Sequence, residues 1–397
     1  MKLQAYHPEW AFRAALQARA ARWQRQQLLS PEQLAGIAVA YPLDYYRPVW
    51  PLRVALFLFA WFGLVMASGF TFLITGESLF AAGAVHCAAC FGVLELLIRE
   101  RKFYRAGADN ALLYAGLGVA VALIFYVFSV YLWPVSLAHL ALSNGYLAPP
   151  LLLTLALLLA ATLRYADAVV SAAAFFNVLL LVALLGLQSA LGQALLPFLA
   201  MAAAGGALVF QLLLRRRMAG TYLADYYATC LLVLKVLGLV VLYLGGNYLV
   251  VREGNAALHD LYTSVQVPFA AIFYAFTAGI PLLYIMLGLR RADRPTLLVG
   301  LLALAFSLYT LRHYRSLLPP EIAALLAGIV LTALAGILLR GLRPARFGLT
   351  SLPDDEPRHF NLENLIQAQT AHAPAAPAGG FAFGGGQSGG GGATGQF

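Results

Sequence analysis

Charged residues are scarce in this chain of 397 residues. Asp, Glu, Lys and Arg make up 11% of the sequence, whereas apolar residues make up 61%. Soluble proteins carry about 25% charged and roughly 45–50% apolar residues. The imbalance indicates a protein embedded in a lipid bilayer rather than a soluble one.

Cysteines are few, and common catalytic signatures are missing. Cys87, Cys90 and Cys230 fall inside apolar stretches, so no disulfide framework is expected. The sequence contains no phosphate-binding loop, no nucleophile elbow, no His-Glu-x-x-His and no cluster of carboxylates suited to hydrolysis. These absences disfavour an enzyme, and we expect neither a resident metal nor a cofactor.

Ten apolar stretches could each cross a bilayer. A hydrocarbon core of about 30 Å needs about 20 helical residues, and every crossing must be a helix because unpaired backbone is not tolerated there. The predicted fold class is therefore all-α, a polytopic transmembrane bundle of about ten spans, of which the fourth and ninth are the shortest. The predicted spans are 51–75, 78–98, 109–133, 148–163, 166–187, 193–214, 225–251, 267–289, 295–312 and 320–341.

The positive charges alternate between the two sides of these spans. Cytoplasmic connections are enriched in Lys and Arg. Of the 26 Lys and Arg residues, 22 fall in the N-terminal segment, the even-numbered connections and the C-terminal tail. We therefore predict that both termini are cytoplasmic. The net charge of +9 reflects this asymmetry and the anionic leaflet it faces, not binding to nucleic acid.

The chain divides into three predicted parts. Residues 1–50 form a cytoplasmic amphipathic helical segment, residues 51–342 the transmembrane domain, and residues 343–397 a disordered glycine-rich cytoplasmic tail. The tail buries too little apolar surface to offset the entropy of ordering, since ten of its last 19 residues are glycine. No secretory signal precedes the first span, so we expect that span to be an uncleaved anchor.

The N-terminal segment is predicted to form two helices. Ser30, Pro31 and Gln33 form a capping-box sequence that starts the second. The first helix, over 8–27, either lies in the headgroup plane as a basic amphipathic helix or packs in a hairpin on the protein's own cytoplasmic loops. The predicted apolar face of the first helix consists of Phe12, Leu16, Ala20 and Trp23.

Two segments resemble known bacterial sequences. The stretch from Trp23 to Gln33, WQRQQLLSPEQ, resembles the start of a bacterial membrane-protein family known as domain of unknown function 2157. That resemblance implies a bacterial inner-membrane protein with many spans and no established activity. The glycine-rich end, from Phe383 to Phe397, is similar to the ends of other bacterial membrane-associated proteins and implies an adaptor or processing tail.

Lys235 and His86 are the candidate binding residues inside spans. A lysine deep in a membrane helix costs about 2.5–3.5 kcal/mol and is a functional-site hypothesis by default. Either Lys235 is a structural cation that pairs with a carboxylate, most plausibly Glu95, or it serves a substrate, ion or proton. His86, Cys87 and Cys90 share a helix face and would need a third thiol to hold a metal; small residues are also ordinary packing material in membranes.

Two functions follow as hypotheses. The first is a scaffold or assembly factor that contacts the lipid bilayer and binds a membrane-protein partner through its N-terminal helices or its C-terminal tail. The alternative is a transporter or flippase with a polar site at Lys235 and Glu95. Pro197 and the stretch 279–281 are predicted to break or bend their helices, as the binding-site helices of transporters do.

Overall fold

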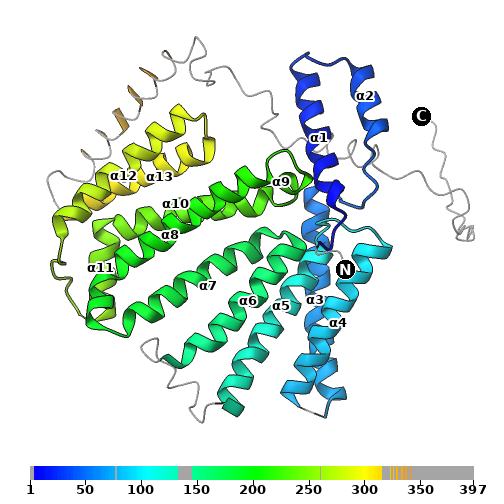
Figure 1. Ribbon diagram of the computed structural model, residues 1–397, viewed down its shortest axis with the longest axis horizontal. Helices are drawn as coiled ribbons and strands as arrows, with labels where there is room; N and C mark the ends of the chain where they lie inside the picture. The colour runs from blue at the N-terminus through cyan, green and yellow to red at the C-terminus, as the bar shows by residue number, and fades with distance from the viewer. Residues whose placement is uncertain are drawn as a thin grey trace, which may run out of the picture.

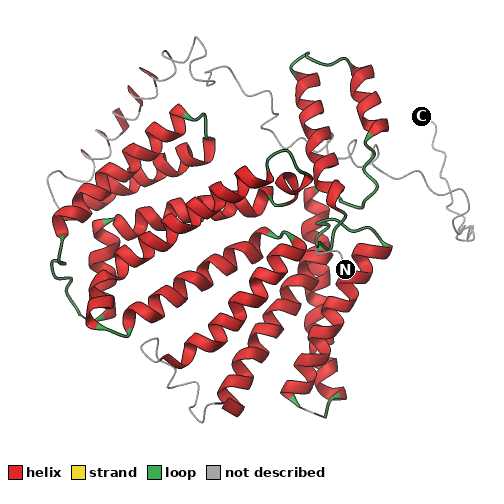
Figure 2. Cartoon of the chain, viewed as in Figure 1, coloured by secondary structure: helices red, strands yellow, loops and turns green. Residues whose placement is uncertain are grey.

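The chain is all-helical over the part that the structure describes. The computed structural model describes residues 4–76, 78–132, 145–259 and 261–314, and isolated positions between 322 and 340. Figure 2 shows helices joined by loops, with no strand among these residues. The elements are α1 Pro8–Arg25, α2 Pro31–Ala40, α3 Trp50–Ile74, α4 Leu79–Glu100, α5 Ala108–Val127, η1 Phe128–Leu132, η3 Gly145–Leu147, α6 Ala148–Tyr165, α7 Ala168–Leu187, α8 Ala190–Met218, α9 Tyr222–Tyr226, α10 Ala228–Gly246, α11 Tyr248–Leu258, α12 Ala270–Arg290 and α13 Arg294–Tyr314.

Nine helical segments in this part of the chain are long and apolar enough to cross a membrane. They coincide with the first nine predicted spans, including the short fourth and ninth. The tenth predicted span, 320–341, lies mostly outside the described residues, and the predicted tail, 343–397, lies wholly outside them. The nine helices indicate a multi-pass membrane protein.

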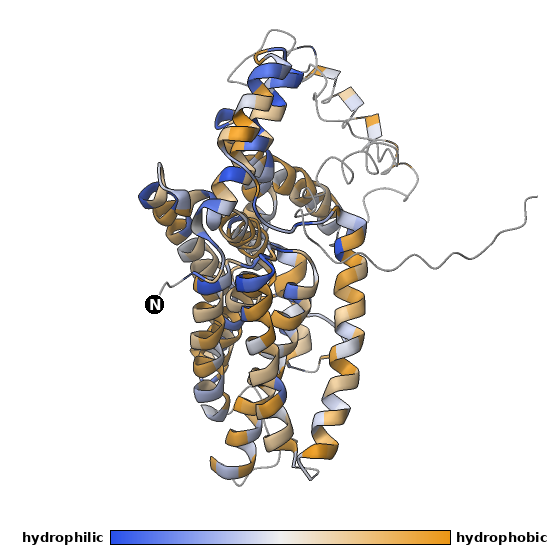
Figure 3. Cartoon of the chain, turned by 90° about the vertical axis from the view of Figure 1, so that its right-hand side faces the viewer, coloured by the Kyte–Doolittle hydropathy of each residue, from blue (hydrophilic) through white to orange (hydrophobic). Residues whose placement is uncertain are grey.

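The membrane helices form a fan (Figure 1). Their ends nearest α1 converge beside α9, whereas the opposite ends spread along an arc. We call the converging ends proximal and the spread ends distal. The apolar residues lie along the spans, and polar residues gather on α1 and at the proximal ends (Figure 3). The outer surface of the fan suits lipid, since α3 buries none of its residues.

The largest hydrophobic cluster lies at the proximal end. Tyr6 and Trp10 join buried residues of α4, α5, α6, α7 and α10 in this cluster. Two further clusters lie between α10, α12 and α13 and between α11 and α12. Tyr6 and Trp10 are therefore built into the core of the membrane domain, although they belong to the segment predicted to be a separate cytoplasmic part.

The second N-terminal helix begins at its predicted signal, and the first begins at a cap that was not predicted. The Ser30 hydroxyl accepts from the Gln33 backbone N–H at 3.1 Å, and the Gln33 amide oxygen accepts from the Ser30 N–H at 2.9 Å, so the capping box is confirmed. α1 begins after His7, whose ring accepts from the Glu9 N–H at 3.4 Å. Both helices therefore follow from local sequence.

The structure shows the second of the two arrangements left open for α1. α1 and α2 form a hairpin that projects beyond the proximal ends of the membrane helices, and α1 packs on α9 (Figure 1). The predicted apolar face is only partly right. Ala20 is fully buried and Phe12 and Leu16 are half-buried, but Trp23 is 43% exposed, and the buried positions also include Trp10 and Ala11. Aromatic packing, not helical periodicity alone, decides which face is covered.

The helices are not interrupted at the two predicted proline sites, and an interruption lies elsewhere. Pro197 and Pro281 sit inside the continuous helices α8 and α12. The predicted seventh span, 225–251, is instead divided: α10 ends at Gly246, and Asn247 caps a new helix, α11. Asn247 accepts from the N–H groups of the following turn, which makes a fresh helix start more favourable than continuation.

Candidate functional site

Asp109 anchors the N-terminal segment to the membrane domain at the proximal end. Its carboxylate is fully buried and accepts from the Tyr6 hydroxyl at 2.9 Å and from the N–H groups of Ala106 and Gly107 at 2.8 and 3.0 Å. Burial, followed by the neighbouring Asp109 charge, raises the pKa of Tyr6 well above its usual value. Tyr6 therefore stays a hydrogen-bond donor at every physiological pH.

Gly107 lets the chain turn into α5 at this point. Its φ of +105° suits glycine, and a Cβ there would stand 2.1 Å from the backbone oxygen of Arg53. The glycine thus permits both the turn and the close approach of α3. Asp109 then sits in the first turn of α5, where a carboxylate is stabilised by the helix dipole.

Tyr104 is the centre of an aromatic cluster beside Asp109. Its ring lies 5.2 Å from the ring of Tyr6, 5.8 Å from that of Trp10 and 5.0 Å from that of Tyr45. The Arg105 guanidinium lies over the same ring at 5.5 Å. Such edge contacts and cation–π contacts each add to area burial, so the N-terminal segment is held by packing as well as by Asp109.

Asp167 fixes the start of α7 in the same region. Its side chain caps the helix and also accepts from the Asn110 amide at 3.0 Å and the Tyr114 hydroxyl at 3.1 Å. Both partners lie on α5, so one carboxylate joins two membrane helices. Arg105 donates to the backbone oxygen of Ala166 at 2.7 Å next to it.

Glu95 pairs with Arg164, and the predicted pairing of Glu95 with Lys235 is wrong. One Glu95 oxygen accepts from Arg164 Nε at 2.8 Å, from Arg164 Nη2 at 2.7 Å and from the Tyr165 hydroxyl at 2.8 Å. α4 carries Glu95 and α6 carries Arg164, and the two helices meet at the proximal end. We use the name proximal junction for the group Tyr6, Glu95, Asp109, Arg164 and Asp167.

Lys235 forms its ion pair with Asp293, in the turn between α12 and α13. The side chain therefore extends from α10 towards the proximal end of the bundle, as long cationic side chains commonly do. Thr296 also donates to Asp293, at 2.5 Å. Burial opposes ionisation of Asp293, but the hydrogen bonds from Lys235 and Thr296 outweigh it and lower the pKa of the carboxyl.

His86 takes part in neither the Glu95–Arg164 nor the Lys235–Asp293 ion pair. It is buried on α4, nine residues before Glu95, which is about 14 Å along the helix. Cys87 contacts the Gly116 backbone oxygen at 3.5 Å, and Cys230 contacts the Asp167 backbone oxygen at 3.3 Å. Within the described residues no three His, Cys, Asp or Glu side chains gather as metal ligands would.

A second buried polar network lies at the distal end of α10. The Asn247 amide donates to the Tyr243 hydroxyl at 2.9 Å and to Thr310 Oγ1 at 3.1 Å. Tyr243 also contacts the Ser307 hydroxyl at 2.8 Å. These partners lie on α10 and α13, so the network ties the broken helix to its neighbour.

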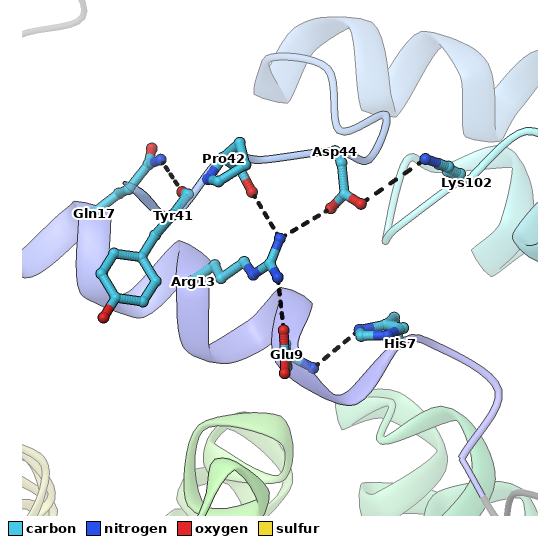
Figure 4. Close-up of polar contacts among 8 residues, drawn as sticks. All are labelled: His7, Glu9, Arg13, Gln17, Tyr41, Pro42, Asp44 and Lys102. Carbon is cyan, nitrogen blue, oxygen red and sulfur yellow. Dashed lines mark hydrogen bonds and ion pairs between the residues drawn. The ribbon is translucent and has the colours of Figure 1, made fainter. Parts of the chain in front are cut away.

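The base of the hairpin is attached to the α4–α5 connection by a third set of contacts (Figure 4). Arg13 lies 2.7 Å from Glu9 and 3.7 Å from Asp44, and Asp44 lies 3.8 Å from Lys102. Backbone bonds reinforce this attachment, because the Tyr46 N–H donates to the Lys102 oxygen at 2.9 Å. Exposed ion pairs of this length contribute little by themselves, so they orient the hairpin rather than hold it.

No similar protein is found for this chain. Comparison of the chain with protein-family models, curated proteins and solved structures finds no significant match. The resemblance of Trp23–Gln33 to the domain of unknown function 2157 family therefore stays a prediction.

We expect Lys235→Met to destabilise the protein in a pH-dependent way. A carboxyl whose pKa is lowered on folding adds stability above its ordinary pKa of 3.8 and loses it as the pH falls through the lower folded value. In the variant, Asp293 keeps its burial but loses its cation. The difference in unfolding free energy between wild type and variant should be largest above about pH 5 and shrink below about pH 4.

The measurement is chemical unfolding of the detergent-solubilised chain at several pH values. Lys102→Met serves as the control, because Lys102 is exposed and its distance to Asp44 is 3.8 Å. A destabilisation by Lys235→Met that is the same at pH 7 and pH 3.5 would rule out the ion pair as its cause.

Proposed function

We propose that this protein is a membrane scaffold or assembly factor that holds a protein partner through the α1–α2 hairpin. The observation that supports the proposal most strongly is the exposure of helix α2. It buries none of its residues, although it is mostly apolar and has Glu32 as its only charged residue. Val39 is 81% exposed. An exposed apolar helix in a soluble environment marks an interaction site.

The attachment of the hairpin supports this proposal. Tyr6 and Trp10, just before and within α1, are built into the core, and Asp44 and Tyr46, just after α2, contact the α4–α5 connection. Both ends of the hairpin are thus fixed to the membrane domain. A binding element that is already ordered loses less entropy when a partner docks.

A protein partner fits α2 better than a lipid surface does. Interfacial helices that bind membranes carry Lys and Arg on their polar face. α2 has none, and the hairpin projects away from the membrane helices (Figures 1 and 3). A partner groove that accepts an amphipathic or apolar helix has the matching chemistry.

We also propose that the hairpin lies in the cytoplasm, at a bacterial inner membrane. The proposal is supported by the basic residues of the α4–α5 connection, of the last turn of α8 and around the α12–α13 turn, which belong to the same side of an alternating bundle as the hairpin. Positive residues favour the cytoplasmic side. The partner would then be a cytoplasmic protein or the cytoplasmic face of another membrane protein.

The transporter alternative depends on a shared polar site at Lys235 and Glu95, and these two residues do not pair with each other. Lys235 and Glu95 lie in separate ion pairs, with Asp293 and Arg164 respectively. The first pair joins α10 to the α12–α13 turn, and the second joins α4 to α6. We therefore argue for the scaffold.

We expect Val39→Glu to weaken partner binding at least about tenfold, because it would place a charge inside an apolar interface. Ala18→Glu is the matched control, since Ala18 is an exposed apolar residue on the other helix of the same hairpin. The measurement is the amount of each identified protein that co-purifies with the solubilised full chain. Equal co-purification with both variants and wild type would contradict the proposal.

A further inference from the structure

A cavity of about 560 Å³ opens beside the proximal junction, between the N-terminal segment and the ends of α4 and α6. Ligand pockets commonly have volumes of about 300–1,000 Å³. Buried side chains of Tyr6, Trp10 and Ile98 form apolar parts of its wall. The charged and titratable groups that line it are His7, Asp44, Glu95, Arg99, Lys102 and Arg164.

The cationic side chains that line this cavity differ in how fully they are paired with carboxylates. Arg164 and Glu95 satisfy each other through two hydrogen bonds. Arg99 reaches Glu95 only at 3.4 Å, and Lys102 reaches Asp44 only at 3.8 Å. Their side chains remain 67% and 56% exposed. Arg99 and Lys102 therefore keep hydrogen-bond donors that an anion could use.

The cavity lies at the end of an apolar candidate span, α4. The buried apolar face of α4 runs through Leu94 to Ile98, and Arg99 follows directly. Basic pockets at this depth between membrane helices suit the headgroups of anionic lipids. The apolar wall formed by Tyr6, Trp10 and Ile98 suits the glycerol and upper acyl part of such a lipid.

We propose that this cavity binds a phosphate group through Arg99 and Lys102, and that an anionic phospholipid headgroup supplies it. Gln4, Ala5 and Tyr6 form one side of the cavity, and α4 and α6 form the other. A bound headgroup would therefore join the N-terminal segment to the membrane domain. A ligand that binds only the folded state adds to its stability in proportion to its affinity and concentration.

The test uses the full chain in nanodiscs of phosphatidylcholine to which phosphatidylglycerol is titrated, with lipid binding measured by native mass spectrometry. We expect the double variant Arg99→Gln, Lys102→Gln to bind phosphatidylglycerol at least about tenfold more weakly. Arg99→Lys with Lys102→Arg should keep binding, because it retains both charges. The control is Arg216→Gln with Arg217→Gln, which removes the same charge from an exposed part of α8.

A second arm adds soluble glycerol 3-phosphate. Failure of this compound to displace the lipid supports the headgroup as the source, whereas displacement at millimolar concentration supports the phosphate site and assigns it to a free phosphate. Equal loss of lipid binding in the two Gln double variants, or equal retention of phosphatidylcholine and phosphatidylglycerol by wild type, would overturn the proposal.

Discussion

Asp109→Ala is expected to lower the unfolding free energy by at least about 3 kcal/mol, because three buried donors would lose their acceptor at about 1–3 kcal/mol each. The donors are the Tyr6 hydroxyl and the N–H groups of Ala106 and Gly107. None of the three can turn to water without opening the core at the proximal end. The variant should therefore also release the N-terminal segment from the membrane domain.

Two measurements check this expectation. Chemical unfolding of the solubilised chain gives the free energy, and limited proteolysis reports release of residues 4–46. Tyr6→Phe should cost only about 1 kcal/mol, because it removes one donor and leaves the backbone bonds intact. Asp225→Ala is the control, since Asp225 is paired with Arg19 at 3.5 Å near the surface. An Asp109→Ala variant as stable as Asp225→Ala would show that the buried carboxylate is not the anchor.

The second large effect is expected for Asn247→Ala, at about 2–4 kcal/mol. The Asn247 side chain caps α11 and also donates to Tyr243 and Thr310, so the variant removes a helix cap and two interhelical partners together. Loss of the cap should shift the boundary between α10 and α11.

The matched control for this variant is Asn255→Ala, within α11 and only partly buried. It should change the unfolding free energy by no more than about 0.5 kcal/mol. Hydrogen exchange of the amides at 248–251 gives a second readout, in which Asn247→Ala should lose protection. Unchanged protection together with unchanged stability would contradict the role assigned to Asn247.

The sequence predicts the spans well because a membrane crossing is a property of a single segment. About twenty consecutive apolar residues satisfy the bilayer irrespective of their neighbours. The capping box at Ser30 is likewise local, and the structure confirms it. The break at Asn247 was missed because proline was expected to mark it, whereas an asparagine cap inside an apolar run is a weaker signal.

Contacts between distant segments could not be read from the sequence in the same way. Depth along a helix does not say which side chains meet, so the sequence alone pairs Glu95 with Lys235, whereas in the structure Glu95 meets Arg164 of α6. Asp293 lies in a connection, outside any predicted span, yet a lysine side chain is long enough to reach it from α10.

The anchor residue Asp109 was missed for a related reason. A carboxylate in the first turn of a predicted span signals a helix start, and that much was available from the sequence. Its partner Tyr6 lies 103 residues away. Folding brings Tyr6 and Asp109 together, and Tyr6 of the N-terminal segment thereby becomes part of the hydrophobic core.

The most direct measurement of the central claim is photo-cross-linking in intact cells from a reactive residue placed at Val39. The account predicts a discrete adduct with one identified cytoplasmic or membrane protein, with no such adduct from the same residue placed at Ala18. Cross-links from position 39 to lipid alone, or to proteins on the opposite side of the membrane, would contradict it.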